Sequence, residues 1–310
     1  MKYFILLMFL SLSTSKIFAV DFPLISELGS SAKSIGMGNV EGFTDGPNTV
    51  FENPAALALT QDYSVSIFSS SAMNEAFYNS MALGAKTPLG KIGIGYMDLT
   101  VHNIPETYQT GSNATFDTRF HEKDFFDYKS SIFKISRAFT INENTWGGFS
   151  LNLYSKRFYT VNGRGYSFDF GTLHKVKNIT LSAVAHNILP NGKMMYADGK
   201  NEDLPFQLVL GAQIPVEKYI RDNLNLIPQY KYTNKQHLLS MGLNYNPKMI
   251  PFVELLAGFK QHLSVTLDKK ESLTLGIGLL MGNLRFYYAY EKSDYIEVDN
   301  KNHFSIQYSL

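Results

Sequence analysis

The chain has 310 residues, which is enough for one large domain or two small ones. Its formal net charge is +1 and it has no long run of Lys or Arg, which argues against a nucleic-acid partner and against a strongly basic membrane-surface patch. It contains no cysteine, which excludes disulfides, thiolate metal sites, a cysteine nucleophile and a lipoprotein anchor. Aromatic residues make up 14% and charged residues only 18%, a mixture that favours wide sheets facing an apolar environment.

Residues 1–19 have the pattern of a secretory signal peptide. Lys2 precedes an apolar run from Tyr3 to Leu12, and Ala19 provides a small residue at a plausible cleavage point. The alternative, a transmembrane anchor, needs roughly 20 apolar residues, about twice the length of this run. No later segment has the length and apolarity of a spanning helix. The mature chain is therefore either soluble outside the cytoplasm or a membrane protein built from strands.

Residues 20–61 do not alternate as a strand does. They include glycines at 29, 36, 38, 42 and 46 and prolines at 23, 47 and 54, and Asn53 is suited to cap a short helix that begins at Pro54. Such a segment cannot join a β-ladder and is too apolar to extend into solvent. We predict that it forms a plug, or hatch, packed inside a barrel that residues 62–310 form.

Apolar and small or polar residues alternate in most of the chain after residue 61. In the last strand Phe304, Ile306, Tyr308 and Leu310 share one face, and serines and Gln307 share the other. About fourteen segments have this character, each close to the 9–11 residues that a tilted strand needs to cross a bilayer. The predicted strands cover residues 62–70, 76–86, 91–101, 127–139, 145–158, 164–175, 178–187, 204–214, 222–232, 236–245, 252–261, 271–280, 284–292 and 302–310.

The connections between these strands differ in length on the two sides of the predicted sheet. Those on the side of the termini are short, except the one from Pro215 to Arg221, whereas the other side carries the two longest, His102 to Phe126 and Ile188 to Asp203. An even strand number, short inner turns and long outer loops are typical of bacterial outer-membrane barrels. We therefore predict an all-β fold, a transmembrane antiparallel β-barrel with a short N-terminal plug, located in the outer membrane and surrounded by its lipid.

A soluble secreted β-protein is the alternative. A propeller would show a repeat of about 40–50 residues, and none is visible. The chain also ends on an amphipathic strand, and the side chains of Phe304, Ile306, Tyr308 and Leu310 resemble the C-terminal signal that barrel-assembly machinery recognises. The usual final Phe or Trp is Leu310 here.

Two motifs in the predicted plug carry a resemblance to a known family. The stretch Ser31 to Val40, with Gly36, Met37 and Gly38 at its centre, and the later run Asn53-Pro54-Ala55-Ala56-Leu57 resemble the N-terminal signature of the FadL superfamily. The resemblance implies that the Asn-Pro-Ala motif belongs to the plug. This chain has Lys33 where an Arg is common before Gly-Met-Gly, and it is short for a fatty-acid channel.

Within that superfamily the sequence resembles the PorV/PorQ group. The likeness rests on three later segments: Ala185 to Ile188, Leu204 to Gly211, and Asn302 to Ile306. It implies a docking barrel that holds exported proteins or components of type IX secretion at the cell surface.

The sequence gives no sign of catalysis. The seven histidines lack metal-binding spacing and fall mostly at predicted strand ends or loops, where we expect solvated side chains at the rim. No Gly-x-Ser-x-Gly elbow or phosphate-binding loop is present. A Ser-His pair that meets only across strands stays open as an alternative. We expect a protein that is not an enzyme, uses no cofactor or metal and binds no nucleic acid.

Two functions follow from the resemblance. The leading prediction is a PorV/PorQ-like component of protein secretion or surface export. The alternative is a FadL-like channel for small hydrophobic molecules such as long-chain fatty acids. A kink or a missing pairing in a strand would favour the channel, and Gly93, Gly95, Gly276 and Gly278 are candidate positions, unless these glycines only allow plug side chains to pack closely.

Overall fold

A computed structural model describes residues 25–72, 76–110, 119–190, 192–216, 223–233, 236–263, 270–292 and 301–310. The predicted signal peptide, residues 1–19, lies outside the described residues.

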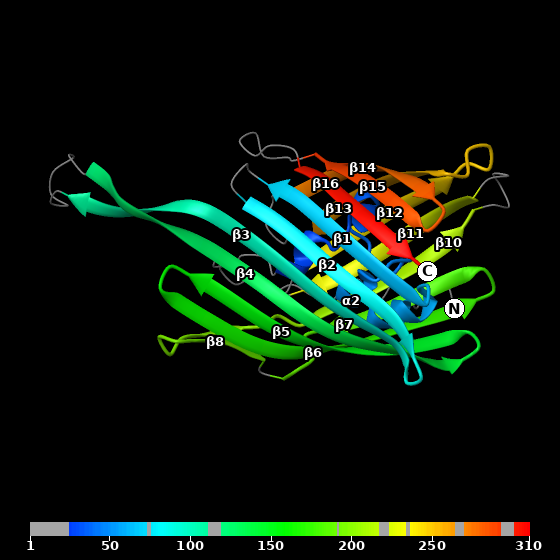
Figure 1. Cartoon of the computed structure of the whole chain (residues 1–310), viewed down its shortest axis with the longest axis horizontal. Helices are drawn as coiled ribbons and strands as arrows, with labels where there is room; N and C mark the ends of the chain where they lie inside the picture. The colour runs from blue at the N-terminus through cyan, green and yellow to red at the C-terminus, as the bar shows by residue number, and fades with distance from the viewer. Residues whose placement is uncertain are drawn as a thin grey trace.

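The fold is a closed antiparallel β-barrel of 14 strands, as predicted (Figure 1). Each strand pairs with its neighbours along the barrel, and the first strand closes the ring by pairing with the last, with Val65 opposite Tyr308 and Ile67 opposite Ile306. The barrel strands are β1 (Tyr63–Ala72), β2 (Ala76–Thr87), β3 (Gly90–Thr110), β4 (Arg119–Asn142), β5 (Thr145–Phe158), β6 (Val161–Val176), β7 (Ile179–His186), β10 (Gln207–Pro215), β11 (Asn223–Thr233), β12 (Gln236–Asn246), β13 (Val253–Leu263), β14 (Lys270–Met281), β15 (Leu284–Glu291) and β16 (Lys301–Ser309).

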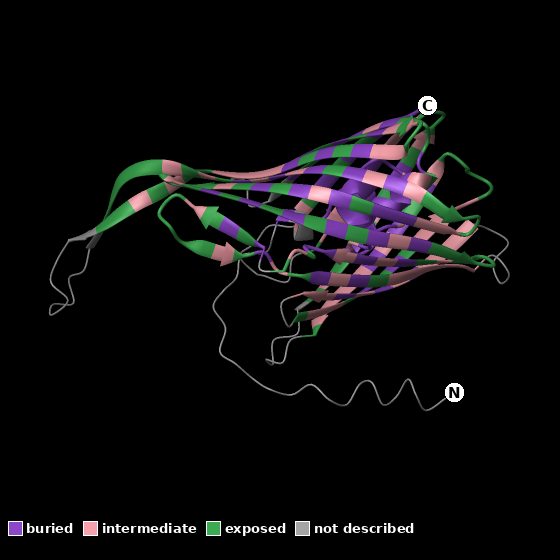
Figure 2. Ribbon diagram, turned by 90° about the horizontal axis from the view of Figure 1, so that it is seen from below, coloured by how far each residue is buried: buried purple, intermediate pink, exposed green. Residues whose placement is uncertain are grey.

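The alternation of the sequence becomes the two faces of the barrel wall. In β16, Phe304, Ile306 and Tyr308 point outward and are exposed, whereas Ser305 and Gln307 point inward and are buried. Buried and exposed residues alternate along the strands of the wall (Figure 2). An outward apolar face meets lipid, and small or polar inward side chains leave room for material inside the barrel. Among the described residues, no helix has both the length and the apolarity needed to cross a membrane.

The described residues before β1 lie inside the barrel. They form four short helical elements: η2 (Ile25–Leu28), α1 (Ala32–Gly36), α2 (Thr49–Glu52) and η3 (Pro54–Leu59). The Ser31 side chain caps α1 by accepting a hydrogen bond from the Ser34 N–H, and the Asn53 side chain caps η3 in the same way through Ala55. We call residues 25–60 the plug.

One predicted loop is instead β-structure. Residues 102–126 were expected to be irregular, but β3 and β4 continue as a two-stranded ribbon that pairs as far as Thr110 and Arg119, with β-bulges on the way. The ribbon extends beyond the rest of the barrel wall (Figures 1 and 2). We call the end of the barrel that carries it the outer mouth. The second long connection, 188–203, contains the small hairpin of β8 (Lys193–Tyr196) and β9 (Asn201–Asp203), and β8 pairs with β6.

Candidate functional site: the plug and its seat in the barrel

The Gly-Met-Gly motif of the plug packs directly on the backbone of the barrel wall. The Gly38 N–H donates to Thr274 Oγ1 (3.0 Å), and the same hydroxyl donates to the Gly36 carbonyl (3.2 Å). A Cβ at Gly258 would lie 1.9 Å from the Gly38 nitrogen, and a Cβ at Gly242 would lie 2.7 Å from the Met37 carbonyl oxygen. Glycines on β12 and β13 therefore allow the plug backbone to approach the wall. We call this contact the first seat.

The Asn-Pro-Ala motif forms a second seat on β5, β6 and β7. The Asn53 side-chain amide donates to the Thr172 carbonyl (3.2 Å) and to Ser182 Oγ (2.9 Å), while its oxygen accepts from the Ala55 N–H (3.0 Å). A Cβ at Gly171 would lie 2.0 Å from the Asn53 side-chain oxygen. The motif thus caps a helix and fixes the plug to the wall with the same side chain.

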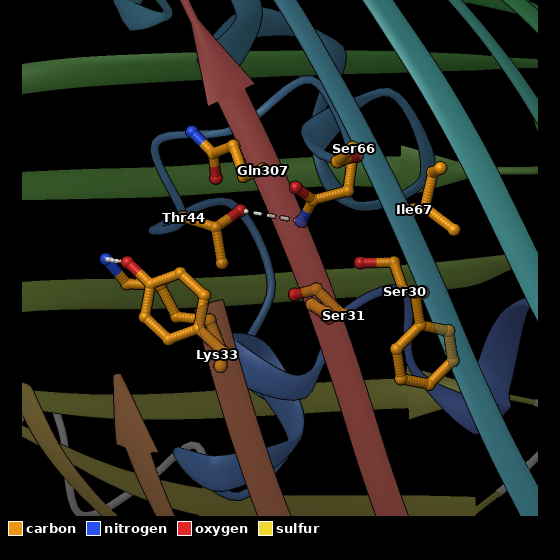
Figure 3. A pocket seen from close by; sticks show the side chains of 11 residues that line it. Ser30, Ser31, Lys33, Thr44, Ser66, Ile67 and Gln307 are labelled. Carbon is orange, nitrogen blue, oxygen red and sulfur yellow. Dashed lines mark hydrogen bonds between the residues drawn. The ribbon is translucent and has the colours of Figure 1, made fainter. Parts of the chain in front are cut away.

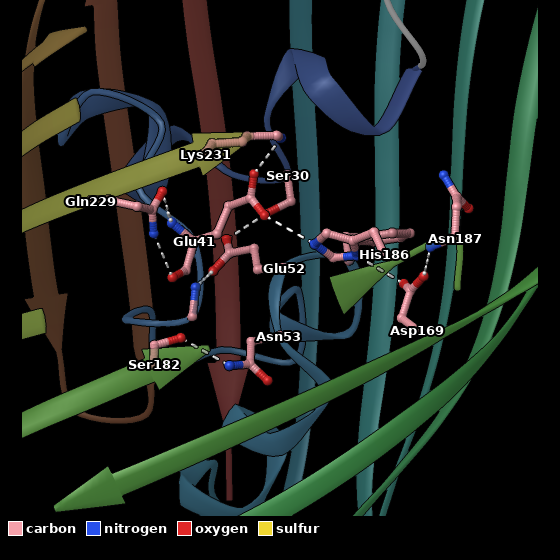
Figure 4. Close-up of polar contacts among 12 residues, drawn as sticks. Ser30, Glu41, Glu52, Asn53, Asp169, Ser182, His186, Asn187, Gln229 and Lys231 are labelled. Atoms are coloured by element: carbon pink, nitrogen blue, oxygen red, sulfur yellow. Dashed lines mark hydrogen bonds and ion pairs between the residues drawn. The ribbon is translucent and has the colours of Figure 1, made fainter. Parts of the chain in front are cut away.

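A chain of buried ionic groups joins the plug to the wall between the two seats (Figure 4). Glu41 of the plug binds Lys231 Nζ on β11 at 2.7 Å and His186 Nε2 on β7 at 3.1 Å. The other ring nitrogen of His186 lies 3.0 Å from Asp169 on β6, which binds Lys134 of β4 at 2.6 Å. Burial by itself would raise the pKa of Glu41, but Lys231 and His186 lower it to about 2. Glu41 is therefore ionised and ties the plug to two strands of the wall, β7 and β11, that lie on either side of β10.

Lys33 makes a further ionic contact with the wall. Its ammonium lies 3.0 Å from Glu254 on β13 and 3.1 Å from Asp45 of the plug, and it sits 5.2 Å from the centre of the Tyr287 ring. Next to it, Ser30, Ser31 and Gln307 line a polar gap of about 10 Å³ between the plug and the β1 and β16 strands (Figure 3). That volume holds about one water molecule. The plug therefore fits tightly against the wall at this point.

Glu52 is buried without a cation among the described residues. Its carboxylate accepts hydrogen bonds from Ser30 Oγ (2.5 Å), the Gly42 N–H (3.0 Å) and Thr44 Oγ1 (2.9 Å), all within the plug. Burial raises the pKa of Glu52 to about 7, against the opposing effect of these hydrogen bonds. The group therefore ties three parts of the plug together and changes charge near neutral pH.

We expect the plug to be less stable at pH 8 than at pH 5. The pKa of Glu52 is about 7 when the plug is folded and about 4.5 when it is released, so the folded plug binds the proton more tightly. The protonated carboxyl stabilises the folded plug fully below pH 4.5, and this stabilisation, roughly 3 kcal/mol at most, is lost as the pH rises through 7. Hydrogen exchange of plug amides at the two pH values, corrected for intrinsic exchange rates, measures the difference in plug stability. If Glu52→Gln kept the same pH dependence, another group would be responsible.

The side of the plug that faces the outer mouth is covered by an apolar layer. Met97, Ile132, Tyr154, Met194 and Leu204 are buried there in one cluster. We call this cluster the apolar layer.

Farther out, aromatic rings line the wall that rises toward the β3–β4 ribbon. Phe126 lies 5.1 Å from Phe158 and 5.3 Å from Tyr159, between ring centres. Phe158 and Tyr159 are exposed. These rings lie on the inner face of the outer mouth, and Lys156, paired with Glu202 at 2.7 Å, lies between them and the apolar layer over the plug.

The hydrogen-bonded wall has a gap between β10 and β11. Gly211 pairs with Gln229 and Ile214 pairs with Leu226, but Ala212 and Gln213 have no ladder partner on β11 among the described residues. Pro228 occupies β11 at this gap, and proline has no N–H to give to a ladder. We call this gap the seam. Inside it, the Phe43 ring of the plug packs against Gly211, at 2.8 Å from the position of an added Cβ.

The glycines that the sequence suggested as kinks have a different role. Gly93 and Gly95 lie on β3 where pairing with β2 is continuous, and plug side chains fill the space beside them: Leu57 beside Gly93, and Val50 and Phe51 beside Gly95. Gly276 and Gly278 likewise lie within the continuous ladder between β13 and β14. These glycines allow close packing, and the missing ladder pairs lie beside Pro228 instead.

The structure also changes the interpretation of two histidines. His186 and His303 were expected at a solvated rim, but both are buried, because their strand positions face the filled interior. The predicted motif residues lie apart: Gly36, Met37 and Gly38 in the first seat, and Asn53, Pro54 and Ala55 in the second. Phe304, Ile306, Tyr308 and Leu310 face outward and do not take part in either seat.

Sequence reasoning did not find Glu41, Lys231 or Pro228. Glu41 and Lys231 are 190 residues apart and belong to no local motif, so no spacing could reveal the pair. Pro228 did carry a signal, because a proline inside a predicted strand marks a point where pairing fails.

A scan against protein-family models gives no match, and neither does a search of curated protein sequences. Solved structures do match. CymD, a monoaromatic hydrocarbon channel, has a TM-score of 0.66 and 13% identity over 92% of this chain and 98% of its own. The toluene transporter TodX of Pseudomonas putida has a TM-score of 0.60 and 11% identity over 90% of this chain and 96% of its own. A FadL homologue of Pseudomonas aeruginosa has a TM-score of 0.61 and 12% identity over 90% of this chain and 97% of its own.

These likenesses define the class of fold as a FadL-like outer-membrane β-barrel. The expected resemblance to the FadL superfamily is confirmed at the level of the fold. The narrower PorV/PorQ assignment receives no support from the matched structures.

Proposed function

We propose that this chain is a channel of the bacterial outer membrane that admits small hydrophobic molecules. The observation that carries the proposal is the seam at Pro228, which lies in the wall beside the plug. A substrate would enter along the aromatic surface of the outer mouth, reach the apolar layer over the plug and leave sideways through the seam. Two of the matched structures are named as a hydrocarbon channel and a toluene transporter, which supports a channel function for this chain as well. The chain would act without catalysis.

The first test locks the seam. The chain contains no cysteine, so the pair Gln213→Cys and Ile227→Cys, which the register of the flanking ladder pairs places opposite each other at the seam, can form the only disulfide. We expect uptake of radiolabelled toluene by cells carrying this variant to fall at least fivefold on oxidation and to recover on reduction.

The matched control is Ser136→Cys with Ser150→Cys, whose side chains already meet across the continuous ladder of β4 and β5. Oxidation of the control pair should leave toluene uptake unchanged. Equal uptake by oxidised and reduced seam variants would rule out the sideways exit.

Protein secretion is the second candidate function, and one feature favours it. The β3–β4 ribbon extends from the barrel and exposes Tyr108 and Phe125, large side chains of the kind that protein partners bind. In this case exported proteins or secretion components would dock on the ribbon. Replacing residues 104–125 with a short turn separates the candidates: a channel keeps its seam and plug, whereas a docking barrel loses its partner.

We further infer that the outward-facing residues of β16, Phe304, Ile306, Tyr308 and Leu310, form the signal by which barrel-assembly machinery inserts the chain. The observation behind this is that these side chains point out of the barrel and leave the plug contacts to the opposite face of the strand. Phe304→Ser with Tyr308→Ser should reduce the amount of barrel in the outer membrane while leaving both seats intact.

A further inference from the structure

His303 is a buried polar side chain without a hydrogen-bond partner. It lies on the inner face of β16 with 3% of its surface exposed, and neither ring nitrogen has a hydrogen-bond partner among the described residues. Buried polar groups are nearly always hydrogen-bonded, so such an exception calls for an explanation. An imidazole in this position is ready to bind a polar group that the described residues do not supply.

The position of His303 is at the boundary between the plug and the outer part of the barrel. The next inward-facing residue of β16 is Ser305, whose Oγ accepts a hydrogen bond from the Ala32 N–H of the plug at 2.7 Å. Gln307 follows and donates to the Asp45 carbonyl of the plug at 3.4 Å. His303 is thus the first inward-facing side chain of this strand beyond the plug contacts, on the side of the outer mouth.

The surroundings of His303 are apolar on one side and polar on the other. Phe68 stacks on the imidazole, with 6.1 Å between ring centres and an angle of 12°, and Tyr78 meets Phe68 edge-on at 5.4 Å. On the other side, Glu291 Oε2 lies 3.8 Å from His303 Nε2, and Lys260 neutralises this carboxylate at 2.6 Å. The apolar side holds the imidazole ring in place, and the ring nitrogens on the polar side suit a neutral hydrogen-bonding group.

We propose that His303 binds the hydroxyl group of a hydrophobic substrate, an alcohol or a phenol, just outside the plug. The inference rests on the proposed channel function and names its substrate class. A hydroxyl both donates and accepts, so it satisfies a neutral imidazole in either tautomer. Glu291 disfavours a substrate carboxylate, and Lys260, already held by Glu291, disfavours a second cation.

The test compares toluene with p-cresol, which differ by one hydroxyl group. We measure uptake of each radiolabelled compound by cells that carry the chain, relative to empty-vector cells. The wild-type protein should favour p-cresol by roughly two- to tenfold, the effect of one hydrogen bond. His303→Phe keeps a ring beside Phe68 and should remove this preference without changing toluene uptake. His303→Gln should keep part of it, and His174→Phe, at an exposed histidine, should keep all of it.

The result that would overturn the inference is an unchanged p-cresol-to-toluene ratio in His303→Phe, as expected if only water occupies the site. Heat-dependent gel mobility checks that each variant forms a barrel. A second readout does not depend on transport: the ¹⁵N signals of His303 in the detergent-solubilised protein should shift with p-cresol and not with toluene. If neither compound enters cells faster, the channel proposal fails, and these NMR signals still decide whether His303 binds a hydroxyl.

Discussion

Glu41→Leu is expected to release the plug from the barrel wall. The substitution removes the carboxylate that Lys231 and His186 share in a buried site, and breaking a buried ion pair by deleting one partner costs about 3–5 kcal/mol. Because the two seats remain, we expect the middle of the plug to detach while the barrel stays assembled. Limited proteolysis of the plug in intact outer membranes measures the release.

The double variant Glu41→Leu with Lys231→Met distinguishes the effect of an unpaired buried charge from the effect of altered side-chain packing. Replacing both members of a buried ion pair by apolar residues of similar size is often close to neutral for stability. We therefore expect the double variant to recover most of the protease resistance that Glu41→Leu loses, a coupling that a double-mutant cycle quantifies. Equal resistance of Glu41→Leu and the wild-type protein would mean that the ionic chain does not hold the plug.

Gly258→Val should prevent the plug from reaching its first seat. The first side-chain atom would lie 1.9 Å from the Gly38 nitrogen and 2.3 Å from the Met37 carbonyl carbon, and both are backbone atoms that no rotamer change can move away. Helix α1 must then shift away from β13, with loss of the hydrogen bonds to Thr274. We expect ion conductance through the purified barrel in planar bilayers to increase at least tenfold.

The matched control for this prediction is a substitution at Ala257, the residue that precedes Gly258 on β13. Ala257 points outward between neighbouring leucines, so Ala257→Val adds the same kind of volume on the lipid side and should leave the conductance at the wild-type level. A conductance of Gly258→Val equal to that of Ala257→Val would contradict the role of the first seat.

The sequence predicted the barrel well because a membrane imposes a simple rule on each strand. Outward residues must be apolar and inward residues small or polar, so β16 and β14 could be located from alternation alone. The same rule fails beyond the membrane. Residues 102–126 lack the alternation and include Pro105 and several charges, yet they extend the barrel strands, because a ribbon needs only its own cross-strand pairs.

The candidate site was only partly predictable. The Gly-Met-Gly and Asn-Pro-Ala motifs were visible because close backbone contact and helix capping require particular residue types at short spacing. The groups that join plug and wall were not visible, because Glu41, Asp169 and Lys231 are far apart in the sequence and meet only when the plug packs against the folded sheet. The buried state of His303 depends in the same way on the filled interior.

The proposal that the chain is a channel for small hydrophobic molecules is tested most directly by the uptake of toluene and of raffinose by cells carrying the wild-type chain. A plugged barrel with an apolar entrance should admit the hydrophobic molecule and exclude the sugar. We predict initial rates of toluene uptake several times those of empty-vector cells, with no increase for raffinose. The opposite result would contradict the proposed channel: raffinose uptake increases and toluene uptake does not, in cells whose outer membrane contains the folded barrel.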